Sequence, residues 1–207
     1  VAVAGDSIVT ASEDRTLKIL DAADGSCRAI LAEHTNRVRC VCIMPDGRII
    51  SGSRDCTLIV WAPDGSHLRT LERHGDFVWC VAALADDRVA SGSKDGTIRI
   101  WDVNTGRELS EIDGNGAVRC LAVLPGGKLI ANGAHGELNL WDEQGRYIRL
   151  LDDGDEEEIT SVAVLSASVV LAGSEEGSLT LWNTDEYEFR TTRGHEAAVW
   201  ALASLPN

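Results

Sequence analysis

Two stretches of the chain read Ser51-Gly-Ser-Arg-Asp-Cys-Thr-Leu-Ile-Val-Trp61 and Ser91-Gly-Ser-Lys-Asp-Gly-Thr-Ile-Arg-Ile-Trp101. Weaker copies of the same pattern cover residues 10–20, 131–141 and 172–182. The closing residue of each copy falls at 20, 61, 101, 141 and 182, in steps of 41, 40, 40 and 41 residues. Five copies at nearly constant spacing indicate a repeat architecture, in which each copy builds one structural unit.

The repeated stretches have the pattern of β-strands buried on both sides. In residues 58–61, Leu58 and Val60 lie on one face and Ile59 and Trp61 on the other. Apolar residues on both faces predict a strand sandwiched between neighbouring sheets. Turn signals such as Pro45-Asp-Gly47 and Asn104-Thr-Gly106 separate the apolar segments. We expect four short strands in each repeat, in the second near 37–44, 48–54, 57–62 and 67–72, and no helix.

Four-stranded units of about 40 residues that close on Trp or Trp-Asp resemble the WD40 family of β-propellers. Residues 101–102 and 141–142 carry the Trp-Asp pair, whereas Trp61-Ala62, Trp182-Asn183 and Leu20-Asp21 each depart at one position. The resemblance covers essentially the whole chain and implies an all-β propeller with five four-stranded blade repeats. These would span about 1–33, 34–73, 74–113, 114–154 and 155–194, with a further blade starting at 195–207.

The number of repeats bears on closure of the ring. WD40 rings usually have seven blades, or roughly 280–300 residues. The sequence starts part-way through an expected inner strand at 1–4 and ends after another near 198–205. We therefore expect part of a seven-bladed ring, completed by flanking sequence. Two alternatives stay open: closure as a five-bladed ring, or pairing of two copies through open blade ends, which would otherwise expose apolar faces.

Composition narrows the class of partner and the compartment. Net charge is −14 over 207 residues, and an acidic surface repels phosphate backbones, so we expect no nucleic-acid partner. No apolar run approaches the ~18–20 residues that cross a bilayer, so we expect no membrane association. Cys40, Cys80 and Cys120 recur every 40 residues inside apolar segments, without a CxxC pair. This pattern favours reduced core cysteines and a cytoplasmic protein, with the nucleus as an alternative.

The histidines, serines and aspartates suggest two catalytic triads at first sight, but the set recurs at the period of the fold, which points to architecture. The WD40 resemblance implies a hydrogen-bonded network that ties the loops to the sheet. One would contain His34, Ser51, Asp55 and Trp61, and the second His74, Ser91, Asp95 and Trp101. Later repeats carry Gly114, Ala131 and His135, then Asp155, Ala172 and Glu176 at these positions, so we expect more apolar packing there.

No sequence feature predicts catalysis, a cofactor or a metal. The spacing of His34, Cys40 and Cys42 lacks the paired pattern of a structural zinc site. The glycines fall at turns and strand bends, and none forms a phosphate loop. An enzyme with its site in the central channel would need convergent polar residues that break the repeat, and the sequence contains no such cluster.

The resemblance also implies a partner-binding surface, on the face that bears the inter-blade loops and the turn with the repeated Asp. The matching residues of repeats two to four form a basic and aromatic set: Arg37, Arg39, Arg54, Phe77, Trp79, Lys94 and Arg119. Clustered arginine beside aromatic rings suits an acidic or phosphorylated peptide. The alternative is that these arginines are ordinary solvated strand-end residues, as the acidic run at 152–158 is expected to be a solvated loop.

Repeat two, with Val38-Arg-Cys40 and the stretch at 51–55, resembles the phosphopeptide-reading blade of F-box-type WD40 substrate receptors. Those receptors carry an arginine where Trp79 stands, and no F-box lies in these residues. We therefore expect a non-catalytic scaffold or adaptor that binds protein or peptide partners. The alternative is a ubiquitin-ligase-like receptor for acidic or phosphorylated motifs, which would use Arg39, Arg54, Lys94 and Arg119.

Overall fold

The structure is a computed structural model that describes residues 1–133, 135–142, 144–152, 154 and 156–203. These residues form strands, turns and connecting segments, and no helix occurs among them. The chain divides into two compact units, one covering residues 1–111 and the other beginning at Ile112. The all-β class predicted from the sequence is confirmed.

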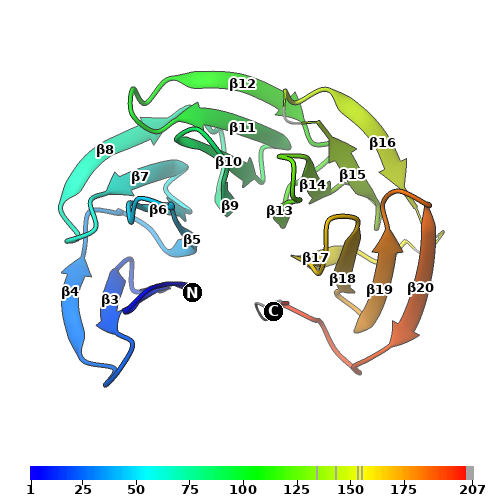
Figure 1. The fold of residues 1–207 in the computed structure, drawn as a ribbon, viewed down its shortest axis with the longest axis horizontal. Coiled ribbons are helices and arrows are strands. Elements are labelled where there is room, and N and C mark those ends of the chain that lie inside the picture. Colours follow the sequence, from blue (N-terminus) through cyan, green and yellow to red (C-terminus); the bar gives the residue numbers. More distant parts are fainter. Residues whose placement is uncertain (134, 143, 153, 155, 204–207) are drawn as a thin grey trace. The chain divides into compact units, whose positions relative to one another are not determined.

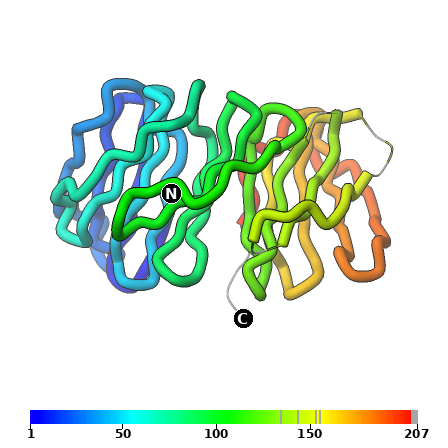
Figure 2. The backbone as a smooth tube through the Cα atoms, turned by 90° about the horizontal axis from the view of Figure 1, so that it is seen from above, coloured from blue at the N-terminus to red at the C-terminus, as the bar shows by residue number. Residues whose placement is uncertain are grey.

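The first unit contains three four-stranded antiparallel sheets, coloured from blue to green in Figures 1 and 2. In each sheet the strands lie side by side in sequence order, because each pairs with the next through a short turn. The first sheet contains β1 (Ala2–Ala4), β2 (Ser7–Ala11), β3 (Leu17–Asp21) and β4 (Cys27–Leu31). The second contains β5 (Val38–Ile43), β6 (Ile49–Ser53), β7 (Thr57–Trp61) and β8 (His67–Glu72). The third contains β9 (Val78–Ala83), β10 (Arg88–Ser93), β11 (Thr97–Asp102) and β12 (Glu108–Asp113), which runs across the unit boundary.

The second unit contains two sheets of the same order. The fourth sheet is made of β13 (Leu121–Val123), β14 (Leu129–Asn132), β15 (Leu138–Trp141) and β16 (Tyr147–Leu151). The fifth is made of β17 (Ile159–Val164), β18 (Val169–Ser174), β19 (Ser178–Asn183) and β20 (Glu188–Arg193). Five four-stranded repeats, as predicted, are therefore present.

The sandwiched strand predicted at 58–61 is confirmed in the first unit. Leu58 and Val60 pack in one core with Val89 and Trp101 of the third sheet. Ile59 and Trp61 pack in another with the first sheet, against residues that include Val9 and Leu17. These four side chains of β7 are nearly fully buried. Burial of each stabilises the fold by about 1.5–3 kcal/mol, so the second sheet depends on both of its neighbours.

A glycine at the end of the second strand lets neighbouring sheets approach closely. A Cβ atom at Gly52 would lie 2.6 Å from Val78 Cγ1 at the start of the next sheet. The same relationship recurs in the second unit, where a Cβ at Gly173 would lie 2.7 Å from Val199 Cγ1. Only hydrogen fits in these contacts, which bring the first residues of one repeat against the second strand of the repeat before it.

The strand expected near 198–205 is not observed. Residues 198–203 form no strand, and 204–207 lie outside the described residues. The Val199 N–H donates to the Ser174 carbonyl at 2.9 Å, as the Val38 N–H at the start of β5 donates to the Ser12 carbonyl at 3.0 Å. The Val199 carbonyl accepts from Thr160 Oγ1 at 2.6 Å and Ser161 Oγ at 2.7 Å. Because side chains of the fifth sheet bind this carbonyl, the segment is held against that sheet without strand pairing.

The fourth sheet departs from the others at its first strand. Asn132 stands where Gly52 and Gly173 stand in their sheets, and it is buried. Its Oδ1 accepts hydrogen bonds from the backbone N–H groups of Arg119 at 2.7 Å and Cys120 at 2.9 Å. These N–H groups are therefore bound by a side chain, and β13 begins only at Leu121.

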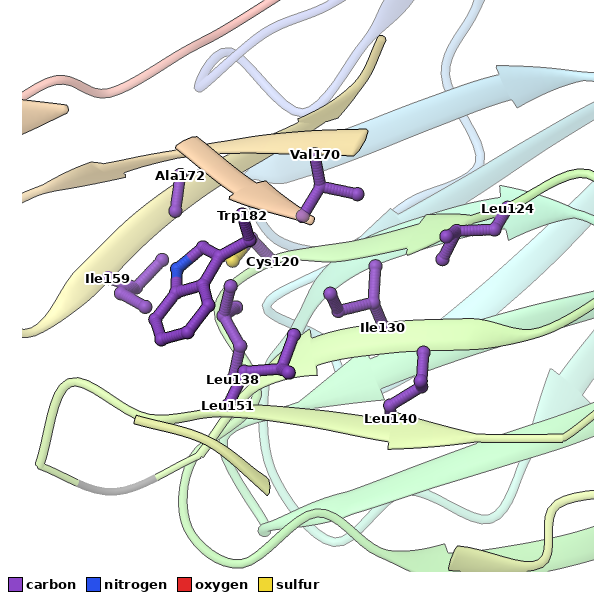
Figure 3. Close-up of a cluster of buried hydrophobic side chains, with 10 residues drawn as sticks. All are labelled: Cys120, Leu124, Ile130, Leu138, Leu140, Leu151, Ile159, Val170, Ala172 and Trp182. Carbon is purple, nitrogen blue, oxygen red and sulfur yellow. The ribbon is translucent and has the colours of Figure 1, made fainter. Parts of the chain in front are cut away.

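The core of the second unit lies between its two sheets. It combines Leu138, Leu140 and Leu151 of the fourth sheet with Ile159 and Trp182 of the fifth, among others (Figure 3). This apolar core includes Ala172, which stands in the fifth sheet where Ser51 and Ser91 stand in the second and third.

Candidate functional site

The second and third sheets each contain a chain of hydrogen bonds that runs from a loop histidine to a buried tryptophan. His34 Nδ1 lies 2.8 Å from Asp55 Oδ2, and His34 Nε2 lies 2.8 Å from Ser51 Oγ. Trp61 Nε1 donates to the same Ser51 hydroxyl at 2.9 Å. Since a carboxylate only accepts and an indole N–H only donates, His34 Nδ1 donates to Asp55, and the Ser51 hydroxyl accepts from Trp61.

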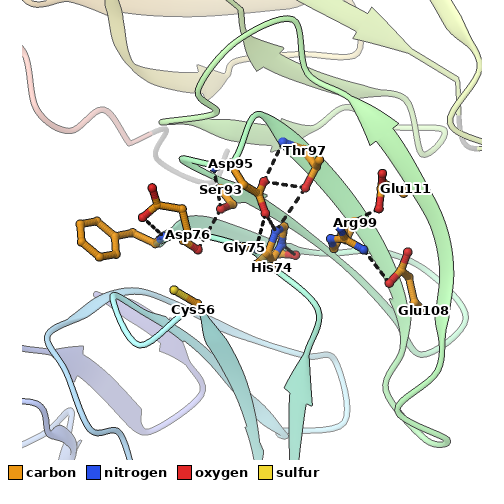
Figure 4. Close-up of polar contacts among 12 residues, drawn as sticks. Cys56, His74, Gly75, Asp76, Ser93, Asp95, Thr97, Arg99, Glu108 and Glu111 are labelled. Carbon is orange, nitrogen blue, oxygen red and sulfur yellow. Dashed lines mark hydrogen bonds and ion pairs between the residues drawn. The ribbon is translucent and has the colours of Figure 1, made fainter.

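The third sheet repeats this geometry closely, as Figure 4 shows for His74 and Asp95. His74 Nδ1 lies 2.9 Å from Asp95 Oδ2, His74 Nε2 lies 2.7 Å from Ser91 Oγ, and Trp101 Nε1 donates to Ser91 at 2.9 Å. Thr97 Oγ1 adds a hydrogen bond of 2.7 Å to Asp95 Oδ1. The structure thus brings together the four residues expected in each sheet.

These serine, histidine and aspartate sets have the wrong environment for nucleophilic catalysis. Ser51 and Ser91 are 0% exposed, so no substrate carbonyl reaches either hydroxyl. Each serine oxygen is already bonded to a tryptophan N–H and a histidine. The arrangement satisfies buried polar groups and fixes the loops to the sheets.

The electrostatics favour a charged aspartate in both sheets and a neutral His74 in the third. Burial raises the pKa of Asp95, but hydrogen bonds from Thr97 and the Gly75 N–H lower it more, so the pKa falls from its ordinary 3.8 to about 2. Burial also raises the pKa of Asp55, yet the bonds from His34 and Thr57 hold it well below its usual range. Burial lowers the pKa of His74 from its ordinary 6.5, and the hydrogen bond to Asp95 offsets only part of this.

The fifth sheet lacks this network. Ala172 stands where Ser51 and Ser91 stand, and the buried Trp182 Nε1 has no hydrogen-bond partner among the described residues. Ser174 instead donates to Glu157 Oε2 at 2.5 Å and accepts from the Ser178 N–H at 2.9 Å. Asp155 lies outside the described residues. The bond between Ser174 and Glu157 joins the positions at which Ser53 donates to the Asn36 carbonyl and Ser93 to the Asp76 carbonyl, so it does not take over the role of the network.

The basic and aromatic residues of the first unit gather at the ends of strands held by the network. The Arg54 N–H donates to the Arg37 carbonyl at 2.9 Å, and the Lys94 N–H donates to the Phe77 carbonyl at 2.9 Å. Each turn residue thus lies beside the residue that precedes the first strand of its own sheet. We call the surface formed by Arg37, Arg39, Arg54, Phe77, Trp79 and Lys94 the loop face.

Phe77 joins the second and third sheets on the loop face. The Arg54 guanidinium lies 5.2 Å from the centre of the Phe77 ring, and the Lys94 ammonium lies 5.0 Å from it. Both distances are within the range of cation–π attraction. One ring therefore attracts two cations that would otherwise repel each other. The Nε atom of Arg54 is buried and has no hydrogen-bond partner among the described residues.

Comparison with known proteins decides the family. The family model described as "WD domain, G-beta repeat" matches residues 25–62, 65–102 and 106–142, together more than half of the chain. The chain belongs to the WD40 family. WD40 propellers commonly serve as scaffolds that bind other proteins and are typically non-enzymatic, and the described residues show the four-stranded blades of that fold.

Two WD40 relatives from Schizosaccharomyces pombe match short segments. The WD repeat-containing protein pop1 is 30% identical over 83 residues, which are 28% of this chain and 11% of that protein. An uncharacterized WD repeat-containing protein is 40% identical over 55 residues, which are 26% of this chain and 15% of that protein. The chain therefore matches only a small part of the length of either relative.

Solved WD40 structures resemble nearly the whole chain. A structure of U3-55K and a crystal structure of the RRP9 WD40 repeats each match with a TM-score of 0.86 and 20% identity. Each match covers 98% of this chain and 68% of the other. At this identity the likeness shows the WD40 fold alone.

Two acidic residues that the sequence reasoning missed contact the WD40 loop face. Glu13, in the turn after β2, forms ion pairs with Arg37 at 3.0 Å and Arg39 at 3.4 Å. Asp76 lies 3.4 Å from the Lys94 ammonium. Both could have been found from the repeat, since Glu13 occupies the turn position of Arg54 and Asp76 directly precedes Phe77.

Trp79 and Arg119 have different surroundings. Trp79 is half-buried in β9 of the third blade. Arg119 belongs to the second unit, where it forms an ion pair of 2.5 Å with Glu158. The Glu175 N–H donates to the Glu158 carbonyl at 2.9 Å, so the fifth blade carries two acids where the second carries Arg37 and Arg54.

Within the described part of the chain, no group of three or more His, Cys, Asp or Glu side chains is arranged to hold a metal ion. The same residues include no helix long and apolar enough to span a bilayer. Burial raises the pKa of Cys40 and of Cys120 to about 12, so these thiols stay protonated near neutral pH. They act as small apolar groups in the blade cores.

Proposed function

We propose that this WD40 chain is a protein-interaction module that binds an acidic segment of a partner on the loop face of its first unit. One observation carries the proposal: Arg54 and Lys94 stack on a single Phe77 ring, with Arg37 and Arg39 beside them. A cluster of four cations is conspicuous in a chain whose net charge is −14.

The chemistry of these side chains suits a carboxylate or a phosphate. A guanidinium presents planar N–H donors that bind either anion in a bidentate manner. Phe77 is half-buried and already contacts two cations, so it offers an apolar surface beside the charged groups. Aromatic residues and arginine are also the side chains that most often dominate binding energy in protein interfaces.

A receptor for phosphorylated motifs is the narrower form of the same proposal. It is supported by Arg37, Arg39 and Arg54 in one blade, and by the likeness of that blade to substrate receptors of the F-box type. Trp79, where such receptors carry an arginine, leaves fewer donors for a phosphate. A matched pair of peptides, one with glutamate and one with phosphoserine at the same positions, separates the two forms.

The experiment compares peptide binding by the 207-residue chain with binding by two charge-reversal variants. Arg39→Glu with Arg54→Glu removes cations of the loop face, and we expect at least a tenfold loss of affinity for the glutamate peptide. Arg73→Glu with Arg107→Glu makes the same charge change at two other exposed arginines of the first unit. It should retain most of the affinity, because neither arginine is one of the loop-face residues.

Two results would contradict the proposal. Equal loss in both double variants would show that only total charge matters. Binding of single-stranded RNA in preference to either peptide would replace an acidic protein segment by a nucleic acid as the partner. A thermal melt of each variant checks that the loss is not unfolding.

A further inference from the structure

Glu13 already places an acidic group among the arginines of the loop face. Its two carboxylate oxygens contact different side chains, Oε2 with Arg37 Nη1 at 3.0 Å and Oε1 with Arg39 Nη1 at 3.4 Å. A carboxylate shared between two guanidinium groups is the geometry that an acidic residue of a partner would adopt. The contacts described for the Glu13 side chain are both with these arginines.

The position of Glu13 follows from the repeat. The Val38 N–H donates to the Ser12 carbonyl at 3.0 Å, which brings the turn after β2 against the start of β5. The residue after Ser12 is the variable turn residue of the first blade, as Arg54 and Lys94 are in the second and third. The turn of one blade therefore presents its variable residue to the first strand of the next.

The ion pairs of Glu13 are exposed and can open without disturbing the core. The Glu13 side chain is 60% exposed, and those of Arg37 and Arg39 are 46% and 36% exposed. Exposed ion pairs of this kind contribute little net free energy, because water solvates the separated charges well. An incoming acid therefore competes with Glu13 instead of meeting two unoccupied arginines.

We propose that Glu13 is an internal occupant of the Arg37–Arg39 site, which the carboxylate or phosphate of a bound partner displaces. This inference rests on the proposed function, since it concerns entry to the same surface. Glu13 then lowers the affinity of the site for acidic segments, so that multiply charged segments are favoured over weakly acidic ones.

The test measures the affinity of the full chain for a poly-glutamate peptide before and after Glu13→Gln. The amide keeps the shape of the side chain and removes its charge. We expect up to about fivefold tighter binding at low ionic strength, the factor that an exposed ion pair can supply. The gain should shrink in about 1 M salt, where the screening length falls to about 3 Å.

The matched control is Glu33→Gln, which makes the same charge change at another exposed residue of the first unit. Glu33 forms none of the ion pairs described above, so its variant should bind as the unchanged chain does. The Nε–Hε resonances of Arg37 and Arg39 provide a second measurement. In Glu13→Gln they should already be shifted without peptide, because the internal carboxylate is gone.

The outcomes separate the two proposals. Tighter binding by Glu13→Gln than by Glu33→Gln supports the internal occupant. Equal binding by both, with binding still lost in Arg39→Glu/Arg54→Glu, overturns the role of Glu13 and leaves the proposed function standing. Failure of the unchanged chain and both Gln variants to bind glutamate or phosphoserine peptides overturns both.

Discussion

Ser91 accepts a hydrogen bond of 2.9 Å from the indole of Trp101, and both residues are almost completely buried. In the fifth blade the corresponding residues are Ala172 and Trp182, and the buried indole N–H has no partner among the described residues. The third and fifth blades thus differ in whether the N–H of the buried tryptophan has a hydrogen-bond acceptor. A buried donor without an acceptor costs about 1–3 kcal/mol.

Removal of the serine hydroxyl should make the third blade resemble the fifth. Ser91→Ala leaves Trp101 Nε1 without an acceptor and His74 Nε2 without its serine partner. We expect the free energy of unfolding to fall by about 1–3 kcal/mol, measured by denaturant titration. Ser110→Ala, at a half-buried site in β12, should change it by less than about 0.5 kcal/mol. Equal effects would show that the hydroxyl of Ser91 has no special role.

The reverse substitution should stabilise the second unit. Ala172→Ser supplies a hydroxyl at the position from which Ser51 and Ser91 accept an indole N–H. We expect a gain of about 0.5–1.5 kcal/mol in the free energy of unfolding. Ala172→Val adds bulk without an acceptor and should not stabilise the chain. A loss of stability in Ala172→Ser would mean that the hydroxyl does not reach Trp182.

Cys56 occupies a backbone conformation that favours glycine. Its φ is 69°, and the residue at the same turn of the third blade is Gly96, with a φ of 87°. A non-glycine residue at positive φ costs the folded state about 1–2 kcal/mol, and substitution by glycine removes this cost. The greater flexibility of glycine in the unfolded chain offsets part of that gain. Cys56→Gly should therefore raise the free energy of unfolding by about 0.5–1 kcal/mol. Cys27→Gly, at the first residue of β4, should lower it. The opposite ranking would contradict a cost of positive φ at Cys56.

Stability should fall on acidification in two steps. The pKa of His74 is lowered in the fold, so below its ordinary 6.5 the unfolded chain takes up a proton that the folded chain excludes. The pKa of Asp95 falls from 3.8 to about 2, so between these values the unfolded carboxyl is protonated first and further stability is lost. Both shifts favour the fold at neutral pH, and both contributions disappear as pH decreases.

The measurement is a series of denaturant titrations of the chain and of His74→Gln from pH 7.5 to 4.5. Other titrating groups affect both proteins, so the difference between the two curves isolates His74. We expect the unchanged chain to lose more stability than the variant across this range. Parallel curves would show that His74 titrates equally in the folded and unfolded states.

The sequence predicted the sheets because the physical signals were repeated. Leu58, Ile59, Val60 and Trp61 alternate between two apolar faces, and the structure places those faces in two different cores. One such segment alone could be a buried helix or a buried strand. Five copies with turns between them leave only strands.

The strand expected near 198–205 shows the limit of such patterns. An apolar alternating segment predicts that a strand can form, but strand pairing needs a neighbour with free backbone groups. The bond from the Val199 N–H to Ser174 does not itself prevent a strand, because Val38 makes the same bond to Ser12 and begins β5. The Val199 carbonyl, however, is bound by the hydroxyls of Thr160 and Ser161. The role of those hydroxyls is specific to the fifth blade, since Arg39 and Trp79 occupy the position of Thr160 in the second and third.

The sequence predicted which residues form the loop face, but not the contacts that balance their charges. The positions of Arg37, Arg39, Arg54 and Lys94 follow from the repeat, but their charge balance depends on contacts between blades. Glu13 lies 24 residues before Arg37, and only the docking of Val38 on Ser12 brings them together. The stacking of Arg54 on Phe77 likewise joins two blades. Local patterns identify which residues lie at a strand end, whereas packing between blades decides which neighbours they meet.

The central claim, that the loop face of the first unit binds acidic segments, is tested most directly by crosslinking from Phe77. A photoreactive benzoylphenylalanine at this position keeps an aromatic ring between Arg54 and Lys94, and a poly-glutamate peptide serves as the probe. The same group at Leu68, an exposed residue of β8, is the control. We predict crosslinking from position 77, little from position 68, and loss of the signal with Arg39→Glu/Arg54→Glu. Equal crosslinking from both positions, or a signal that persists without these arginines, would contradict the claim.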